Sequence, residues 1–170
     1  HMHPDSDQAL QIQLKEKFHY TGARFYNYSQ INRFIKTSKQ LIKKNIAYVC
    51  FCSAERLRDN RVKCLECSCR SRKDSLEKWN EMLKGKYKEG QAVLRLKTDM
   101  NHPNPAFRDR VLFRISERKH PKVGDKYKVW PLLEFSWAID DYLLKVTHVI
   151  RGKELMIESD MERFIWGIFG

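Results

Sequence analysis

Five cysteines, all between positions 50 and 69 of this 170-residue chain, have the clearest chemistry in the sequence. Four of them form two pairs, Cys50-x-Cys52 and Cys67-x-Cys69, on either side of a short charged segment. A disulfide framework would scatter its cysteines, and an odd number would leave one thiol over. Clustered thiols instead favour a metal site in a reducing, intracellular setting, so we expect a cytoplasmic protein.

Four thiolates complete the tetrahedral shell of a zinc ion and leave no position for water, so this site would be structural. The single residue inside each pair is fewer than the roughly two to four of common zinc knuckles. Cys64 lies between the pairs and could replace one ligand, and a set of free buried thiols is the alternative. The pattern predicts structural Zn²⁺ bound by Cys50, Cys52, Cys67 and Cys69.

Basic side chains surround these cysteines. Lys and Arg number 33 against 21 Asp and Glu, which gives a formal net charge of +12. A domain this basic favours a polyanionic partner, because each neutralised phosphate releases counterions; a merely soluble basic surface is the alternative. Arginine binds phosphate in a bidentate way, and a loop held by metal would present it rigidly. The candidate RNA-binding residues are Arg56, Arg58, Arg61, Arg70, Arg72 and Lys73.

Other classes of function lack their signatures. No apolar run approaches the ~20 residues of a membrane span, and no basic amphipathic helix carries bulky aromatics, so we expect no membrane partner. The sequence contains no nucleophile elbow, phosphate loop or paired acid–base constellation, so no catalytic residue is assigned. The opening His1-Met2 is typical of a cloning scar, which indicates that the natural N-terminus lies elsewhere.

The elements that must position the cysteines begin with helix. Residues 4 to 44 are expected to be mostly helical, and their second half has apolar residues at helical spacing behind a possible Ser29 cap. These apolar residues are Ile31, Phe34, Ile35, Leu41 and Ile42. Residues 47–50 then form a short buried strand, which places Cys50 at its end.

The pattern after the cysteines predicts a helix and then two strands. Asp74 and Glu77 have the spacing of a capping box, and Gly85 suits the C-terminal end of the helix that they start. Residues 92–97 and 111–115 then alternate with a period of two. The segment between these strands contains two prolines and is expected to be loop.

The last third of the chain is expected to return to helix and buried strand. Residues 135–142 suit a helix, and residues 146–150 read as a buried strand. Ser159 and Glu162 have capping-box spacing for a final helix with Phe164, Ile165 and Ile168 on one face. This helix runs into the end of the chain, which indicates a truncation there.

Several stretches of sequence together point to one family. They follow in order along the chain at residues 47–52, 67–71, 85–99, 102–105, 108–109, 113–115, 124–131 and 140–154. In these stretches the chain resembles the glutamyl-tRNA synthetases, and residues 85–99 resemble the archaeal branch. The resemblance covers residues 29–170, whereas the first ~25 residues match poorly.

The resemblance implies a fragment of glutamate–tRNA ligase, a class I enzyme. Such enzymes activate glutamate with ATP and Mg²⁺ and pass it to the 3′ end of tRNA. Two ATP signatures of the family, His-x-Gly-His upstream and a Lys-Met-Ser-Lys-Ser type loop downstream, are missing from residues 1–170. The isolated chain is therefore expected to be inactive. Its expected partners are the tRNA acceptor end and, in the intact enzyme, glutamate and ATP.

The resemblance also implies a fold, α/β combined with α+β. Residues 1–59 would be the helical and strand part of a Rossmann-type catalytic domain. Residues 60–125 would be an inserted α+β domain that binds the acceptor stem, with a zinc knuckle formed together with residues 50–52. Residues 126–170 would return to the Rossmann-type fold.

The family also implies substrate-binding positions. Arg151 stands where these enzymes place an arginine near the amino acid, although a surface charge is the alternative. The following residues would meet the nucleotide at the end of a strand. The implied glutamate and ATP residues are Arg151, Gly152, Lys153, Glu154, Leu133 and Trp137.

Two positions depart from the family pattern. Leu133 replaces a pocket tyrosine, so the pocket lacks a hydroxyl group, and Leu155 replaces a histidine. Two other functions stay open at this point. One is a glutaminyl-tRNA synthetase, which shares the architecture, and the other is a stand-alone zinc-containing RNA-binding module.

Overall fold

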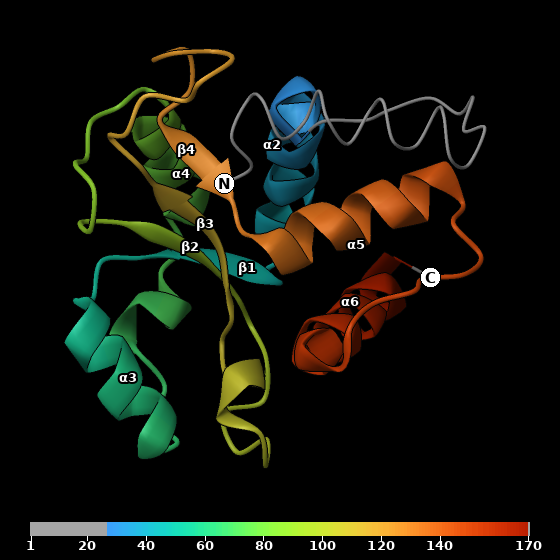
Figure 1. Cartoon of the computed structure of the whole chain (residues 1–170). Helices are drawn as coiled ribbons and strands as arrows, with labels where there is room; N and C mark the ends of the chain where they lie inside the picture. Colours follow the sequence, from blue (N-terminus) through green and yellow to red (C-terminus); the bar gives the residue numbers. More distant parts are fainter. Residues whose placement is uncertain (1–26, 170) are drawn as a thin grey trace.

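The computed structural model describes residues 27–169, and its centre is one antiparallel sheet (Figure 1). The strands follow the chain in the order β1 (Ala47–Cys50), β2 (Val93–Leu96), β3 (Val111–Ile115) and β4 (Val129–Pro131). The α-helices are α2 (Asn27–Lys43), α3 (Ala54–Val62), α4 (Ser75–Leu83), α5 (Leu133–Leu144) and α6 (Met156–Phe169). Short 3₁₀ helices are η1 (Ser68–Ser71), η2 (Pro105–Phe107) and η3 (Lys153–Leu155).

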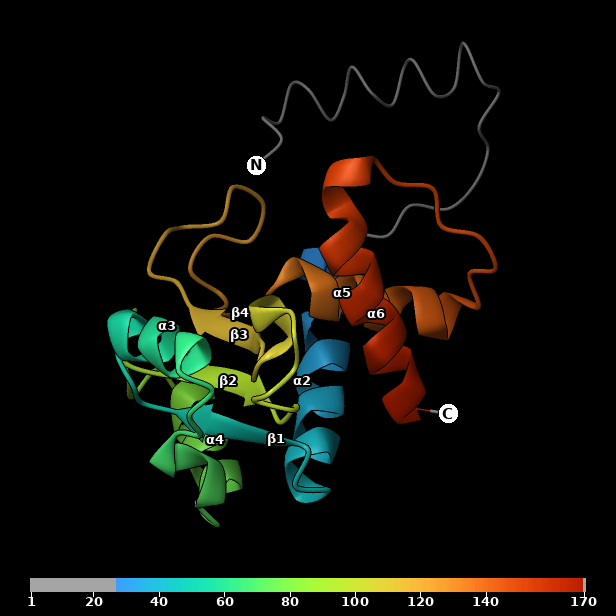
Figure 2. The same ribbon diagram turned by 90° about the horizontal axis from the view of Figure 1, so that it is seen from below.

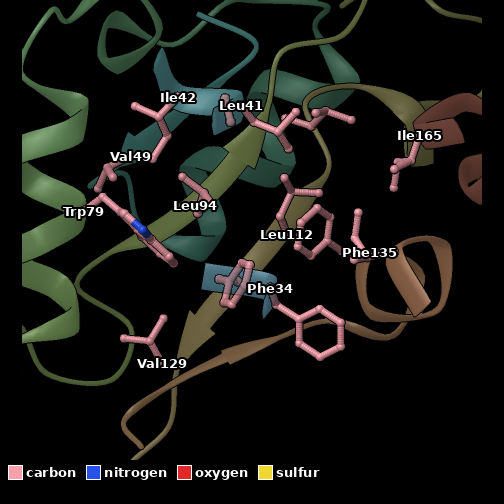
Figure 3. Packing of buried hydrophobic residues seen from close by; sticks show 14 of the residues in the cluster. Phe34, Leu41, Ile42, Val49, Trp79, Leu94, Leu112, Val129, Phe135 and Ile165 are labelled. Atoms are coloured by element: carbon pink, nitrogen blue, oxygen red, sulfur yellow. The ribbon is translucent and has the colours of Figure 1, made fainter. Parts of the chain in front are cut away.

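The two faces of the sheet bury different side chains, because successive residues of a strand point to opposite faces. Ala47 and Val49 of β1 join the main core, together with side chains of α2, α4, α5 and α6. Figure 3 shows part of this core, with Leu94 and Leu112 between Trp79 on one side and Phe135 on the other. Tyr48 of β1 joins a second, smaller cluster, which includes the cysteines. The thiols therefore lie on the opposite face of β1 from the main core.

Helices α5 and α6 pack against one another beside α2, and α3 lies at the far end of the sheet from them (Figure 2). This arrangement separates the cysteine-containing end of the fold from the end that holds residues 133–169. The two sets of residues implied by the sequence, for metal and RNA and for glutamate and ATP, therefore lie in different parts of the molecule.

Most predicted elements are confirmed. The apolar residues predicted for the first helix pack in or against the core from α2, and the two period-two segments form β2 and β3. Gly85 has a φ of +77° and ends α4 as predicted. Its N–H donates to the Met82 carbonyl and the Lys86 N–H donates to the Glu81 carbonyl, each at 3.1 Å, which is the Schellman arrangement. The helix predicted before residue 27 lies outside the described residues.

Of the three predicted caps, one is right in position only and two are wrong. Asp74 is the N-cap residue of α4, but its carboxylate makes no capping hydrogen bond because it accepts two from Arg72, at 2.9 and 2.5 Å. Ser29 lies inside α2. Ser159 lies inside α6, which begins at Met156, and its hydroxyl donates to the Leu155 carbonyl at 3.0 Å. In each case the helix start or the partner of the side chain differs from the short motif.

The buried strand predicted for residues 146–150 is also wrong. These residues form no regular element, and Ile150 is 98% exposed. A strand needs a neighbour for its backbone hydrogen bonds, and no described strand lies beside this segment. In contrast, α3 was not expected. Only Leu57 of this helix is buried, so its sequence has little apolar periodicity.

The α+β part of the expected fold class is confirmed, since helices pack on a purely antiparallel sheet. No parallel strand pair occurs between residues 27 and 169, so this part of the chain contains no Rossmann-type sheet of its own. The sheet draws strands from each of the three segments expected as domains. Over the same residues, no helix is long and apolar enough to cross a membrane.

Candidate functional site

The four paired cysteines converge at one point. Cys50 ends β1, Cys52 precedes α3, Cys67 stands at the start of η1 and Cys69 lies within η1. Their sulfur atoms all lie within 4.8 Å of one another. The Sγ of Cys67 is 3.5 Å from that of Cys50 and 3.6 Å from that of Cys52. Four thiolates at ~2.3 Å from zinc stand about 3.8 Å apart, so this donor set fits a tetrahedral ion.

The thiols of this cluster do not titrate alike. The hydrogen bond that Cys67 shares with the Cys50 thiol, together with the Cys69 N–H that donates to the Cys67 sulfur at 3.3 Å, lowers the pKa of Cys67 to about 4. The pKa of Cys50 is raised by its hydrogen bond with Cys67 and by burial. Burial also raises the pKa of Cys52. Cys67 is therefore the first thiolate, and a metal ion would displace protons from the others.

Cys64 does not join the cluster. Its backbone is left-handed, with a φ of 56°, and its Sγ lies 4.0 Å from the Val62 carbonyl oxygen. The group of side chains between residues 27 and 169 that could hold a metal ion contains the other four cysteines. The clustered sulfur atoms therefore come from the two pairs and not from Cys64.

Arg95 is a site residue that the sequence did not reveal. It is fully buried, its Nη1 lies 3.9 Å from the Cys50 Sγ, and its guanidinium stacks over the Tyr48 ring at 5.6 Å. Four thiolates around Zn²⁺ carry a net charge of about −2, so a buried guanidinium beside them lowers the cost of that charge. The alternation in the sequence showed only that Arg95 and Leu94 point to opposite faces of the strand. The pairing of Arg95 with Tyr48 across β1 and β2 was the missing signal.

Asp109 links the cysteine cluster to the loop between β2 and β3. Its carboxylate is fully buried and accepts hydrogen bonds from Tyr48 Oη at 2.7 Å, Arg70 Nη1 at 2.6 Å and Thr98 N at 2.8 Å. Its carbonyl oxygen accepts from Arg95 Nε at 2.9 Å. One residue with a φ of 45° thus connects β1, η1, β2 and the loop. The segment that carries Cys67 and Cys69 is held to the sheet by this network.

Half of the candidate RNA-binding residues make internal contacts. Arg61 Nε donates to the Arg108 carbonyl at 3.1 Å, and burial lowers the pKa of Arg61. Arg70 binds Asp109, as described above. Arg72 binds Asp74 and lies 5.6 Å from the Phe51 ring centre.

The other half faces solvent. Arg56 and Arg58 lie on α3, and Lys73 precedes α4; all three side chains are exposed. Arg61 and Arg70 therefore help to fix the shape of the cysteine-containing segment. Arg56, Arg58 and Lys73 contribute freely available positive charge.

Arg151 and Trp137 are brought together. The Arg151 guanidinium lies 4.6 Å above the Trp137 ring and binds the Glu162 carboxylate. Its Nη2 is 3.6 Å from Asp141 Oδ2. Burial raises the pKa of Glu162, although Arg151 opposes this effect. The arrangement is a cation fixed by an aromatic face and two acids.

The other implied substrate residues lie apart from Arg151. Leu133 is 53% exposed at the start of α5 and lines a hollow of about 430 Å³ together with Arg114, His120 and Trp130. Arg151 and Trp137 do not line this hollow. Gly152, Lys153 and Glu154 are exposed around η3. The structure therefore brings together two of the six residues, and it places the rest at the surface.

Residues 5–168 match the catalytic domain of the class I tRNA synthetases (E and Q). The chain belongs to this family. Among curated relatives, the glutamate–tRNA ligase of Archaeoglobus fulgidus is 50% identical over 135 residues, which are 78% of this chain and 24% of the relative. That of Pyrococcus abyssi is 45% identical over 148 residues, 85% of this chain and 26% of the relative.

A more distant member of the family gives the same result. The glutamate–tRNA ligase of Methanopyrus kandleri is 38% identical over 149 residues, 86% of this chain and 26% of the relative. The chain thus spans about a quarter of the length of these relatives. The resemblance to archaeal glutamyl-tRNA synthetases is confirmed, and the chain is homologous to part of their catalytic domain.

Proposed function

We propose that this chain is part of a glutamate–tRNA ligase, which activates glutamate with ATP and transfers it to the 3′ end of tRNA. The observation that carries this proposal is the identity of 38–50% to glutamate–tRNA ligases over about four fifths of the chain. The family also includes enzymes for glutamine, but the relatives named above are all glutamate enzymes. Glutaminyl-tRNA synthetase is therefore the second candidate.

A direct experiment separates these candidates. The intact protein should catalyse ATP–pyrophosphate exchange that depends on glutamate rather than glutamine. The 170-residue chain alone should not, because charge that develops on the α-phosphate needs preorganised cationic donors, and the two signature motifs that supply them are absent from its sequence. Exchange that depended on glutamine would contradict the assignment.

The cysteine cluster is proposed to hold structural zinc. The four sulfur atoms supply a complete set of thiolate ligands, and Arg95 offsets part of their charge. Zinc bound there would hold the segment between Phe51 and Arg72 against the end of β1. The role of the ion would be to fix the shape of this loop.

The inserted part, residues 60–125 with the metal-bound residues 50–52, is proposed to bind the tRNA acceptor end. Exposed Arg56, Arg58 and Lys73 and the net charge of +12 support a phosphate-rich partner. Arg61, Arg70 and Arg72 would act by holding the loop in shape, through the contacts described above.

Binding of an acceptor-stem minihelix by the zinc-loaded chain tests this role. The affinity should fall steeply as salt rises and should exceed that for an unrelated RNA duplex of equal length. Arg56→Gln and Arg58→Gln should each weaken minihelix binding, whereas Arg163→Gln, on exposed α6 surface, should not. Equal affinity for both RNAs at every salt concentration would remove the acceptor-end role.

Glutamate and ATP are proposed to bind near Arg151 in the intact enzyme, where residues 126–170 rejoin the Rossmann-type domain. Arg151 is suited to a carboxylate ligand because its planar guanidinium can donate two parallel hydrogen bonds. Trp137 and the acids Asp141 and Glu162 hold it in one orientation. Gly152, Lys153, Glu154 and Leu133 would complete the pocket, with Mg²⁺ accompanying ATP.

A further inference from the structure

A second basic site lies where five segments of the chain meet. A hollow of about 450 Å³ is lined by the end of α2, the start of β1, the residue after β2, the residues before α4 and the first residues of α4. Four cations line it, Lys43, Arg72, Lys73 and Lys97, and no carboxylate does. Arg72 is partly neutralised by Asp74, so the other three supply most of the positive charge.

The N-terminus of α4 opens at this hollow. The first N–H groups of a helix have no partner within it and carry a partial positive charge, so they attract anions. Asp74 has the position of a cap, but its carboxylate makes no capping hydrogen bond. Ser75 and Leu76, the first residues of the nine-residue helix, line the hollow.

Ser75 provides a separate observation. The residue is 5% exposed, yet its hydroxyl has no hydrogen-bond partner among the described residues. A buried polar group without a partner destabilises the fold, so such groups are rare in native structures. An anion in the hollow could accept a hydrogen bond from this hydroxyl and from the adjacent helix N–H groups.

The electrostatics agree with an anionic ligand. Lys97 Nζ lies 2.5 Å from the Asn45 side-chain oxygen, and its ammonium faces no carboxylate in the hollow. Burial, and after it the charge of Arg70, lowers the pKa of Lys97, whereas the charges of Asp109 and Glu66 oppose this shift. An anion bound beside Lys97 would favour its charged form.

We propose that this hollow is a phosphate site, and that its ligand in the intact protein is one backbone phosphate of the bound RNA. A phosphate offers several acceptor oxygens, which matches the Ser75 hydroxyl, the first N–H groups of α4 and the ammonium groups of Lys73 and Lys97. The choice of RNA as the source rests on the acceptor-end binding proposed above. The ability of the hollow to bind phosphate does not depend on that proposal.

Titration of the zinc-loaded chain with inorganic phosphate tests the chemistry. The backbone amide signals of Ser75, Leu76 and Glu77 should shift and saturate in ¹H–¹⁵N spectra. Ser75→Ala should weaken phosphate binding by about two- to tenfold, from the loss of one hydrogen bond. Lys73→Gln should weaken it by about two- to fivefold, as for an exposed charge pair.

Lys84→Gln is the matched control, because Lys84 is an exposed lysine at the other end of the same helix. It removes the same charge and should leave phosphate affinity unchanged. The spectra also report whether each variant is folded. Absence of saturable shifts at the start of α4, or equal losses in Lys73→Gln and Lys84→Gln, would overturn the phosphate site.

A second titration, with the acceptor-stem minihelix, tests the source. The same amides should shift, and Lys73→Gln should reduce the slope of log affinity against log salt by about one, whereas Lys84→Gln should not. If phosphate saturates the hollow but bound minihelix leaves these amides unshifted, the RNA assignment is overturned. If the minihelix binds and neither ligand shifts these amides, the phosphate site is overturned and acceptor-end binding stands. If only phosphate binds, acceptor-end binding and the RNA source both fail.

Discussion

The cysteine-containing end of the molecule and the α5–α6 connector, residues 145–152, differ in how completely their side chains find partners. Around the thiols, groups far apart in sequence bond directly, such as Tyr48 and Asp109, which are 61 positions apart. In the connector, Val146, Val149 and Ile150 are 39%, 40% and 98% exposed. Both segments contain residues typical of strands: Tyr48 and Val49 in β1, and Val146, Thr147, Val149 and Ile150 in the connector. Among residues 27–169, β1 has a neighbouring strand to pair with and the connector has none.

This difference shows which interactions a short motif needs. Residues 47–50 become a strand because β2 offers four partners in register. Residues 146–150 have similar side chains, but no described strand offers backbone partners to them. Local propensity therefore indicates a strand, whereas a neighbouring strand determines whether one forms.

The largest expected effect concerns the metal. Cys67→Ser should reduce bound zinc from about one ion per chain to almost none, because structural zinc binding contributes ~10–16 kcal/mol in zinc-finger peptides. Hydrogen exchange should accelerate across residues 50–73, and exchange in the connector should stay the same. Zinc content by mass spectrometry and amide exchange are the measurements.

Cys64→Ser is the control for this substitution, since Cys64 lies outside the cluster. This variant should retain zinc, and its amide hydrogen exchange across residues 50–73 should stay as slow as in the wild type. Zinc-free wild-type protein, purified without chelator, or equal zinc loss in both variants would contradict the four-cysteine site.

The next effect concerns the buried network. Asp109→Asn should lower the free energy of unfolding by about 3–5 kcal/mol, because it leaves Arg70 without its charged partner and removes the negative charge beside buried Arg95. Asparagine tolerates the left-handed backbone of this position, so the loss would come from charge and not from strain. Urea denaturation measures it. Asp59→Asn, on exposed α3, should change stability little, and a similar loss there would count against the network.

A smaller effect is expected at Arg151. In the intact enzyme, Arg151→Ala should lower kcat/KM for glutamate by an amount equivalent to ~1.5–3 kcal/mol, the size of a charge-assisted hydrogen bond. The KM for ATP should change far less. Arg163→Ala on exposed α6 is the control. Unchanged glutamate kinetics would show that the role implied by the family does not apply to this residue.

The smallest effect is a pH dependence at the C-terminal end of the fold. Burial raises the pKa of Asp140 in α5 from 3.8 to about 6, and its Oδ1 has no hydrogen-bond partner among the described residues. Between these values the folded state binds more protons than the unfolded state, so the free energy of unfolding falls as pH rises. Asp140→Asn should remove this fall, which amounts to about 1 kcal/mol after solvent screening.

Urea denaturation at about pH 4.5 and pH 7.5 measures this change. Asp160→Asn, at an exposed position of α6, should keep the wild-type profile. If Asp140→Asn gave the same pH dependence as the wild type, burial of Asp140 would not be its cause.

Sequence reasoning found the parts of the fold that depend on repeating local patterns. The apolar stripe of α2, the alternation in β2 and the glycine that ends α4 are all visible in sequence. The convergence of the four paired cysteines was visible as well, because thiols that can share one metal ion recur at short spacings. The caps failed because a carboxylate or hydroxyl has several nearby partners, as the binding of Asp74 to Arg72 illustrates.

The roles of the charged residues could not be predicted one at a time. Arg56 and Arg61 look alike in sequence, but Arg56 is exposed and Arg61 reaches the Arg108 carbonyl, 47 positions away. Arg95 and Asp109 gave no local signal, since their partners come from other segments. Burial of charge depends on which distant groups the fold brings near, and no window of sequence contains that information.

The register of β1 against β2 has a consequence for folding kinetics. Cys50 pairs with Val93, and the Cys50–Cys67 contact shortens the loop between those partners from about 43 residues to about 26. Because closure entropy grows only with the logarithm of loop length, this shortening lowers the barrier to pairing by roughly 0.4 kcal/mol. The metal-free chain should therefore form its sheet at nearly the same rate as the metal-loaded one. Zinc would then order the segment between Cys50 and Cys69 after the sheet has formed.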